Sequence, residues 1–246
     1  MGLLTFTSKV LNKLLSRALP CAAVIPAAGL SARMNGEDKL FFIINGKPVI
    51  VHTLLAFQKS NCIKEIIIVT LEQSIEKITD LCKLHNISKV TKIIVGGSTR
   101  AESVLRGISA VSAKTPLVAI HDAARPCIDN TIINSTINMA IKYKAAAPGI
   151  PITSTVKRVK SGRILETINR DDLVEIQTPQ VFDTDLIKGA LTKAMKDSNT
   201  LSDDCMAVEQ LGVNVYVTTG SINNIKLTNR EDIKRIDSVL AGRVID

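Results

Sequence analysis

Residues 22–39 read Ala-Ala-Val-Ile-Pro-Ala-Ala-Gly-Leu-Ser-Ala-Arg-Met-Asn-Gly-Glu-Asp-Lys, and this stretch decides the fold. Its apolar start, residues 22–26, is typical of a buried parallel strand. A loop of small residues follows, and consecutive backbone N–H groups in such a loop can cradle phosphate oxygens. Two cations come next, Arg33 and Lys39, which would neutralise a polyphosphate. The stretch lacks the Gly-Lys-Ser/Thr of a Walker A loop, and Gly29 stands alone, so an ordinary strand-to-loop turn stays the alternative.

Composition limits the kinds of partner that the chain can have. Its 246 residues are 46% hydrophobic and 22% charged, which is an ordinary globular composition with room for one sizeable core. The net charge of +8 is spread without a long basic run, and aromatic residues make up 3%. Small anionic phosphates therefore fit better than a nucleic acid. No apolar run approaches the length of a membrane span, so we expect no membrane partner.

The five cysteines are scattered and contain no Cys-x-x-Cys pair. This spacing favours a reducing compartment over a disulfide framework or a structural zinc site. Residues 1–20 are basic, free of acidic residues and amphipathic, with Phe6, Val10 and Leu14 at helical spacing. A transit peptide, a peripheral helix and a misassigned start codon all remain open for this extension. We expect a cytoplasmic bacterial protein, or a plastid protein if residues 1–20 belong to a transit peptide.

From residue 22 onward, strand and helix patterns alternate. The predicted strands are residues 22–26, 65–70, 92–95 and 117–121. The predicted helices are residues 48–59, 72–84, 100–111 and 130–142. This alternation predicts an α/β fold, a mostly parallel sheet with helices on both faces. Ligands of such sheets bind beyond the carboxyl ends of the strands.

The pattern changes between residues 146 and 182, where extended segments follow one another without a helix. They span residues 150–159, 163–169 and 173–178. We expect an extended β-arm here, at about 146–182. The chain then returns to helices at 184–196, 202–211 and 229–240, with a strand at 214–218. Residues 21–246 therefore read as a single domain with an arm.

Two further motifs follow predicted strands. Gly96-Gly97-Ser98-Thr99-Arg100-Ala101-Glu102-Ser103 pairs glycines, which permit close approach of a flat ligand, with a helix N-terminus. His121-Asp122-Ala123-Ala124-Arg125-Pro126 places a carboxylate at the end of a strand. Asp122 is well placed to hold Mg²⁺, which takes few protein ligands and substrate phosphates for the rest. Its alternative role is to cap the next turn.

These motifs resemble those of the sugar-phosphate nucleotidyltransferases, and among them the 2-C-methyl-D-erythritol 4-phosphate cytidylyltransferases. The resemblance is carried by residues 26–34, by the Gly-Gly-x-x-Arg-x-x-Ser motif and by His-Asp-Ala-Ala-Arg-Pro. Ser202-Asp203-Asp204 and Asn224-Ile225-Lys226-Leu227-Thr228 are similar to two later motifs of the family. The resemblance implies a Rossmann-like nucleotidyltransferase fold and a homodimer held by the β-arm. The chain departs from the family pattern at four positions: Ser31, Asp38, Ser154 and Ser202.

The resemblance also implies roles for individual residues. The catalytic residues would be Arg33, Lys39, Asp122 and Lys226, with Asp122 holding Mg²⁺. CTP would be bound by Pro26, Ala27, Ala28, Gly29, Ser31, Gly97, Ser98, Ser103 and Ala123. The second substrate would be bound by Arg125, Thr155, Arg170, Ser202 and Asp203, with Thr155 and Arg170 reaching across the dimer.

The implied reaction transfers CMP from CTP to 2-C-methyl-D-erythritol 4-phosphate and releases pyrophosphate. Two rival functions stay open on the sequence. One is a cytidylyltransferase that acts on ribitol 5-phosphate, which shares the loop and the paired glycines. The other is a nucleotide-binding module without catalysis, although the chain has all four of the catalytic residues named above.

Overall fold

The fold is built on an eight-stranded mixed sheet. A computed structural model describes residues 19–29 and 38–242. Six parallel strands are joined by antiparallel β10 and β11, in the order β10-β7-β11-β6-β1-β4-β5, with β12 paired to β7. The strands are β1 (Cys21–Pro26), β4 (Ile63–Thr70), β5 (Val90–Val95), β6 (Leu117–Ile120), β7 (Ala145–Pro151), β10 (Val174–Ile176), β11 (Gln180–Asp183) and β12 (Tyr216–Thr219). The predicted α/β class is confirmed.

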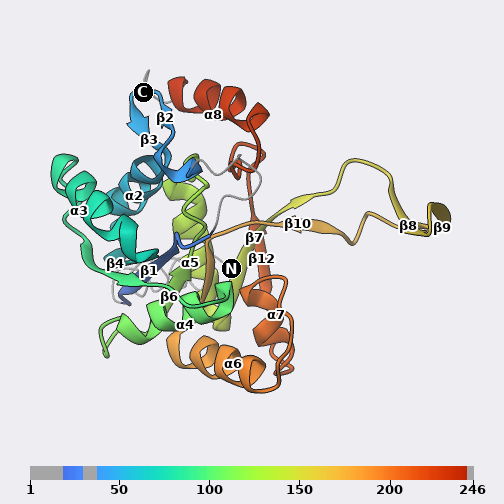
Figure 1. Ribbon diagram of the computed structural model, residues 1–246. Coiled ribbons are helices and arrows are strands. Elements are labelled where there is room, and N and C mark those ends of the chain that lie inside the picture. Colours follow the sequence, from blue (N-terminus) through green and yellow to red (C-terminus); the bar gives the residue numbers. More distant parts are fainter. Residues whose placement is uncertain (1–18, 30–37, 243–246) are drawn as a thin grey trace, which may run out of the picture.

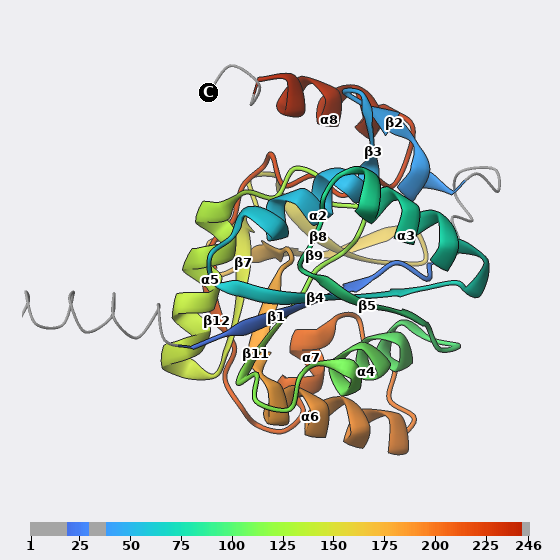
Figure 2. The same ribbon diagram turned by 90° about the vertical axis from the view of Figure 1, so that its left-hand side faces the viewer.

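Helices cover both faces of the sheet (Figures 1 and 2). One face packs against α2 (Val49–Lys59), α3 (Ile75–Leu84) and α5 (Asn130–Tyr143), and α8 (Glu231–Ala241) lies farther out on the same side, next to β2 (Ile43–Ile44) (Figure 2). The other packs against α4 (Arg100–Ala110), α6 (Thr184–Lys196) and α7 (Asp204–Glu209). Between α7 and α8 the chain returns to the sheet through β12, so the predicted order helix, strand, helix after residue 200 is confirmed with shifted ends.

Strand β1 lies at the centre of the sheet and is buried on both faces. Ala23 and Ile25 belong to the apolar core on one side, and Val24 belongs to the core on the other side. This alternation is what a central strand requires, because successive side chains point to opposite faces. β1 pairs in parallel with β4 and β6. The loops after these three strands therefore leave the sheet at the same edge.

The projecting arm is shorter than the sequence predicts. Strands β7, β10 and β11 lie within the predicted range 146–182 but belong to the central sheet. The segment between β7 and β10 projects farthest and ends in the hairpin of β8 (Val156–Lys160) and β9 (Arg163–Ile168), while β10 and the end of β7 lie at its base (Figure 1). The prediction of the arm's bounds was wrong because a sheet strand and an arm strand have the same extended sequence pattern.

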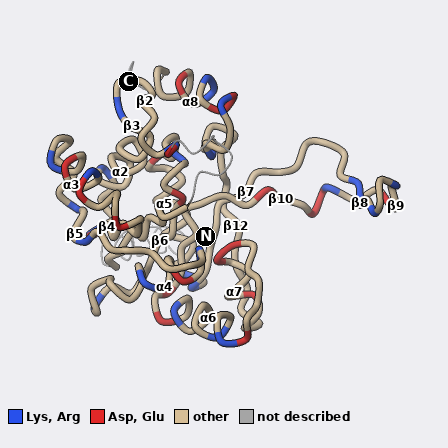
Figure 3. The backbone as a smooth tube through the Cα atoms, viewed as in Figure 1, with Lys and Arg blue, Asp and Glu red and all other residues tan. Residues whose placement is uncertain are grey.

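The hairpin turn of the arm has the backbone conformation that two-residue hairpins favour. Ser161 and Gly162 both have positive φ, at 49° and 76°. Such a turn matches the twist of the flanking strands. Val159, Ile164 and Leu165 are 56%, 64% and 56% exposed on this hairpin, which also contains charged residues, coloured along the backbone tube in Figure 3. The arm therefore presents apolar surface that nothing in the described single chain covers.

A short hairpin on the edge of the fold was not predicted. Strands β2 (Ile43–Ile44) and β3 (Lys47–Pro48) pair around a turn at Asn45 and Gly46, both of which have positive φ. They follow the 3-10 helix η1 (Lys39–Phe41), while a second one, η2 (Glu72–Ser74), precedes α3.

Across the described ranges, no helix is long and apolar enough to cross a membrane. The predictions for residues 1–18 lie outside the described residues.

Helix α4 lies unusually close to the sheet. A Cβ added to Gly107 would lie 2.5 Å from Val24 Cγ1 and 2.8 Å from Val69 Cγ2. The absence of a side chain at Gly107 therefore lets α4 rest directly on β1 and β4. This contact fixes the height at which the N-terminus of α4 meets the loop after β1.

We expect Gly107→Ala to lower the free energy of unfolding by about 1–3 kcal/mol, because overpacking outweighs the gain in helix propensity. Gly189→Ala on α6 is the matched control, since a Cβ there meets nothing within 4 Å. This control should raise the stability by about 0.5–1 kcal/mol. Urea unfolding of both variants measures the effect. Equal stabilisation by both substitutions would show that α4 has room to move.

Candidate active site

A cavity of about 170 Å³ opens at the carboxyl ends of β1 and β6. It is lined by Pro26, Ala27, Ala28, Gly29, Lys39, Leu40, Arg100, Ser103, Asp122, Ala123, Ala124 and Lys226. The loop after β1 is held by the Ala27 amide, which donates to Val69 O at 2.6 Å. The Leu227 amide donates to Ala124 O at 2.8 Å and brings Lys226 beside the β6 loop. The structure thus gathers most of the predicted catalytic and CTP-binding residues.

The first of the paired glycines, Gly96, packs directly against the β1 loop. A Cβ on Gly96 would lie 2.8 Å from Ala28 Cβ and 2.9 Å from Ser103 Oγ. The Ser103 hydroxyl accepts from the Gly97 amide at 3.0 Å and donates to Thr99 O at 2.9 Å. The glycine motif therefore forms one wall of the same region. Ser103 lines the cavity, while Gly97 and Ser98 lie beside it without lining it.

The carboxylate of Asp122 is surrounded by three cationic side chains. Its Oδ2 lies 2.8 Å from Lys226 Nζ and 3.5 Å from Arg125 Nε, and its Oδ1 lies 3.7 Å from Arg100 Nη2. Its side chain is 12% exposed. Burial alone would raise the pKa of Asp122, but Lys226, Arg100 and Arg125 outweigh it and hold the pKa well below its usual value. Asp122 is therefore ionised across the physiological pH range.

The backbone around Asp122 is fixed by a buried polar network. The Asp122 amide donates to Thr178 Oγ1 at 3.2 Å, and that hydroxyl lies 3.0 Å from His121 Nδ1. Asn224 donates through its side-chain Nδ2 to the backbone oxygen of Thr178 at 2.8 Å. The backbone oxygen of Asn224 accepts from Arg125 Nη1 at 2.7 Å. The network ties the β6 loop to the segments that precede β11 and α8. Sequence reasoning did not identify Thr178, because its partners Asp122, His121 and Asn224 are 56, 57 and 46 residues away in the chain.

Arg100 and Asp204 form a second ion pair beside the first. Arg100 donates through Nη1 and Nη2 to the two Asp204 oxygens, both at 2.8 Å. Burial would lower the pKa of Arg100, but the Asp204 carboxylate outweighs it and raises the pKa. The sequence prediction gave Arg100 no role and assigned substrate binding to Asp203, the neighbour of Asp204 in the same Ser-Asp-Asp motif. The Gly-Gly-x-x-Arg motif was the signal available for Arg100.

Lys39 and its neighbour Asp38 show how one departure from the family pattern is accommodated. Lys39 is the first residue of η1, and the Asp38 carboxylate caps this helix by accepting from the Leu40 amide at 3.1 Å. Asp38 therefore fixes the turn that presents Lys39 to the cavity. Two of the predicted residues, Arg33 and Ser31, lie outside the described residues.

The predicted binding residues for the second substrate are dispersed. Thr155 and Arg170 lie on the projecting arm, where Arg170 Nη1 donates to Thr153 O. Asp203 caps α7 by accepting from the Met206 amide at 3.0 Å and also accepts from Gln180 Nε2 at 2.8 Å. Ser202 precedes it and does not line the cavity. Of the five, Arg125 alone lies next to Asp122 within the described chain.

The residues present suit a metal that is held largely by its ligand. Across the described ranges, no group of three or more His, Cys, Asp or Glu side chains gathers into a metal site. Asp122 is the one carboxylate that lines the cavity in the described residues. Magnesium is commonly bound by one or two carboxylates together with substrate phosphates. This chemistry fits a single ionised Asp122 in a cavity rich in cations.

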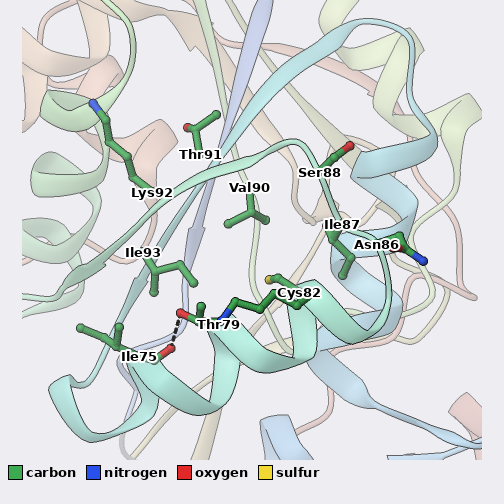
Figure 4. A pocket seen from close by; sticks show the side chains of 11 residues that line it. Ile75, Thr79, Cys82, Asn86, Ile87, Ser88, Val90, Thr91, Lys92 and Ile93 are labelled. Atoms are coloured by element: carbon green, nitrogen blue, oxygen red, sulfur yellow. Dashed lines mark hydrogen bonds between the residues drawn. The ribbon is translucent and has the colours of Figure 1, made fainter.

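A larger cavity of about 530 Å³ lies between α3 and the edge strand β5 (Figure 4). Its lining contains no acidic residue and no histidine. The Thr79 hydroxyl is satisfied within its own helix, donating to Ile75 O at 2.8 Å. Burial raises the pKa of the Cys82 thiol to about 11, so this thiol stays protonated. The convergent charges required for chemistry lie in the smaller cavity.

Solved structures of the same shape define the class of protein. The chain has a TM-score of 0.83 and 28% identity to the 4-diphosphocytidyl-2C-methyl-D-erythritol synthase of Anaerococcus prevotii, covering 93% of this chain and 99% of that one. For the 2-C-methyl-D-erythritol 4-phosphate cytidylyltransferase of Thermus thermophilus the TM-score is 0.74 at 26% identity, covering 89% and 98%. The fold and the cation-lined cavity are those of an α/β nucleotidyltransferase.

Sequence comparison gives the family. A family model described as 2-C-methyl-D-erythritol 4-phosphate cytidylyltransferase matches residues 21–241. The curated relative from Halalkalibacterium halodurans, which carries that name, is 42% identical over 90% of this chain and 97% of its own length. A relative of the same name from Clostridium botulinum is 40% identical over 86% and 93%. The chain belongs to the 2-C-methyl-D-erythritol 4-phosphate cytidylyltransferase family, as the sequence motifs predicted.

The buried His121 predicts how stability depends on pH. Burial lowers its pKa from 6.5 to about 4. Between these values the unfolded state binds more protons, so the free energy of unfolding falls as the pH falls from about 6.5 towards 4. We expect this residue to account for a loss of about 2 kcal/mol between pH 7 and pH 5. Urea unfolding at both pH values measures it.

The His121→Asn variant should be less stable at pH 7 but lose less stability on acidification than the unchanged protein. Burial also lowers the pKa of His52, so its effect has the same sign. His52→Asn is therefore the control, and it should keep the part of the pH dependence that belongs to His121. An unchanged pH dependence in His121→Asn would rule out the buried neutral imidazole.

Proposed function

We propose that the chain transfers CMP from CTP to 2-C-methyl-D-erythritol 4-phosphate and releases pyrophosphate. The observation that carries the proposal is the ionised, 12% exposed Asp122 surrounded by Lys226, Arg125 and Arg100, in a cavity with the phosphate loop. Such a cavity has an excess of positive charge, which suits a triphosphate. Membership of the family supplies the identity of the two substrates.

The reaction is an in-line displacement at the α-phosphorus of CTP. A phosphate oxygen of 2-C-methyl-D-erythritol 4-phosphate forms the new bond to this phosphorus, and the bond to the bridging oxygen of the β-phosphate breaks. Both electrons of that bond leave with pyrophosphate. The attacking phosphate is already ionised near neutral pH, so no general base is required. Positioning and neutralisation of the developing charge are the main contributions of the protein.

The chain's own cations have distinct roles in this mechanism. Lys39 and Lys226 line the cavity and would neutralise the triphosphate, with Lys226 at the α-phosphate. We assign Arg33 to the same task by its place in the loop sequence. Asp122 would hold Mg²⁺, which supplies charge neutralisation that brings the two anions together. Pro26, Ala27, Ala28 and Gly29 would offer backbone groups to CTP, beside the wall formed by Ser103.

We also infer that the chain acts as a homodimer through the arm. An isolated hairpin is marginally stable in water, and the arm exposes Val159, Ile164 and Leu165. A two-fold partner would cover this surface, since the same patch contacts itself in a symmetric dimer. Thr155 and Arg170 on the arm would then complete the partner's site for the second substrate.

A bacterial cytoplasmic location, which the scattered cysteines favour, belongs to the same proposal.

Release of pyrophosphate from CTP tests the function directly. With Mg²⁺ we expect release with 2-C-methyl-D-erythritol 4-phosphate and much less with ribitol 5-phosphate. Asp122→Asn and Lys39→Ala should each lower turnover by orders of magnitude while the circular dichroism spectrum is unchanged, because each removes a charge needed mainly in the transition state. Preference for ribitol 5-phosphate would favour the rival cytidylyltransferase. Binding of CTP without turnover would favour a non-catalytic module.

Mixing two inactive proteins tests the shared site. We expect Arg170→Ala and Lys39→Ala proteins, each inactive alone, to regain activity when their subunits exchange. One site of each mixed dimer would then have its own Lys39 and the partner's Arg170. Light scattering and a tagged subunit would verify dimerisation and exchange. Absence of recovery despite measured exchange, or full activity of a monomer, would exclude the shared site.

A further inference from the structure

The two oxygens of Asp122 have unequal surroundings. Oδ2 lies 2.8 Å from Lys226 Nζ, which is a charge-assisted hydrogen bond. Oδ1 faces Arg100 Nη2 at 3.7 Å, which is too long for a hydrogen bond. The closest contacts of Lys226 and Arg125 with this carboxylate are both made to Oδ2. Arg100 is thus the cation that faces Oδ1, at a distance that leaves this oxygen without a hydrogen bond from Arg100.

Arg100 stays at this distance because Asp204 holds both of its Nη groups. The two bonds are 2.8 Å long, and the Asp204 side chain is 1% exposed. This is the bidentate geometry that a guanidinium fork prefers with a carboxylate. The same Nη2 faces both carboxylates, at 2.8 Å from Asp204 Oδ2 and 3.7 Å from Asp122 Oδ1. A shift of about 1 Å would give Asp122 the hydrogen bond instead.

Asp204 is itself fixed in place. It is the first residue of α7, and its amide and that of Cys205 both donate to Gln180 Oε1, at 3.0 and 3.1 Å. Gln180 Nε2 donates to Asp203 Oδ2 at 2.8 Å. Strand β11 thus anchors the N-terminus of α7. These hydrogen bonds fix the position of Asp204, and its ion pair in turn fixes the position of Arg100.

We propose that Asp204 is a positioning residue, which retains Arg100 by its bidentate ion pair and thereby keeps Asp122 Oδ1 available to Mg²⁺·CTP. This inference rests on the proposed function. Without the Asp204 charge, the Arg100 fork turns to the nearest remaining carboxylate, which is Asp122. Arg100 then competes with the metal for Oδ1. Residues that act in this indirect way on metal ligands typically change metal affinity or activity by about 10–100-fold.

The experiment compares Asp204→Asn with the double variant Arg100→Met/Asp204→Asn. The single Arg100→Met variant is left out because it would leave a buried, unpaired carboxylate and would damage the fold. Two quantities are measured. One is the Mg²⁺ concentration for half-maximal pyrophosphate release. The other, by isothermal titration calorimetry, is the factor by which Mg²⁺ tightens CTP binding, which does not depend on turnover.

In Asp204→Asn we expect the Mg²⁺ requirement to rise about tenfold or more, and the Mg²⁺ effect on CTP binding to shrink by a similar factor. The double variant should recover most of both quantities, because the competing guanidinium is gone. A merely structural role of the pair predicts the opposite, a double variant at least as impaired as the single one. The control is Asp197→Asn, which neutralises the exposed partner of Lys193 on α6 and should match the unchanged protein.

If the unchanged protein is active and the Asp204→Asn variant responds normally to Mg²⁺, this inference is overturned. The proposed function is then still supported. A folded double variant that does not recover also overturns this inference. Failure of the unchanged protein to bind Mg²⁺·CTP overturns the proposed function and the inference together. Circular dichroism and thermal unfolding identify any variant that has lost its fold.

Discussion

The parallel pairing of β1 with β4 and β6 determines where the loops of the candidate site lie. It sends the loops after residues 26, 70 and 120 to one edge of the sheet. Ala28 of the first loop then packs against Gly96, where a Cβ would lie 2.8 Å from Ala28 Cβ. Because Gly107 lets α4 rest on β1, its N-terminal Arg100 reaches the same edge. The site follows from the sheet.

The charges of the candidate site are a second constraint, because cations outnumber carboxylates around Asp122. Three cations, Lys226, Arg125 and Arg100, surround Asp122, while Asp204 neutralises one of them. Lys39 adds a further cation to the cavity lining. A buried group of charges with a positive excess is stabilised when it binds an anion. This excess explains why a polyphosphate ligand suits the cavity, while the low pKa of Asp122 keeps a carboxylate available for a metal.

Much of the fold could be predicted because its signals are local. Apolar periodicity predicted most of the strands and helices, and the resemblance to the family named Lys39, Asp122 and Lys226, which line the same cavity. The ion pair of Arg100 and Asp204 could not be predicted, because its partners are separated by 104 residues and the pairing depends on how α7 meets α4. The predicted bounds of the arm were too wide for a related reason. Residues 145–151 and 180–183 are extended in the sheet, and local sequence does not distinguish them from the projecting strands.

The cations around Asp122 differ in their freedom to leave it, and this difference orders their roles. Arg125 is 10% exposed and donates to Asn224 O at 2.7 Å, so it is fixed. Arg100 is fixed by Asp204. Lys226 is 43% exposed and carries its charge on a flexible stem, with Asp122 at 2.8 Å. If CTP binds as proposed, Lys226 is the cation that would exchange Asp122 for a phosphate at little structural cost. The fixed arginines would then keep the carboxylate ionised.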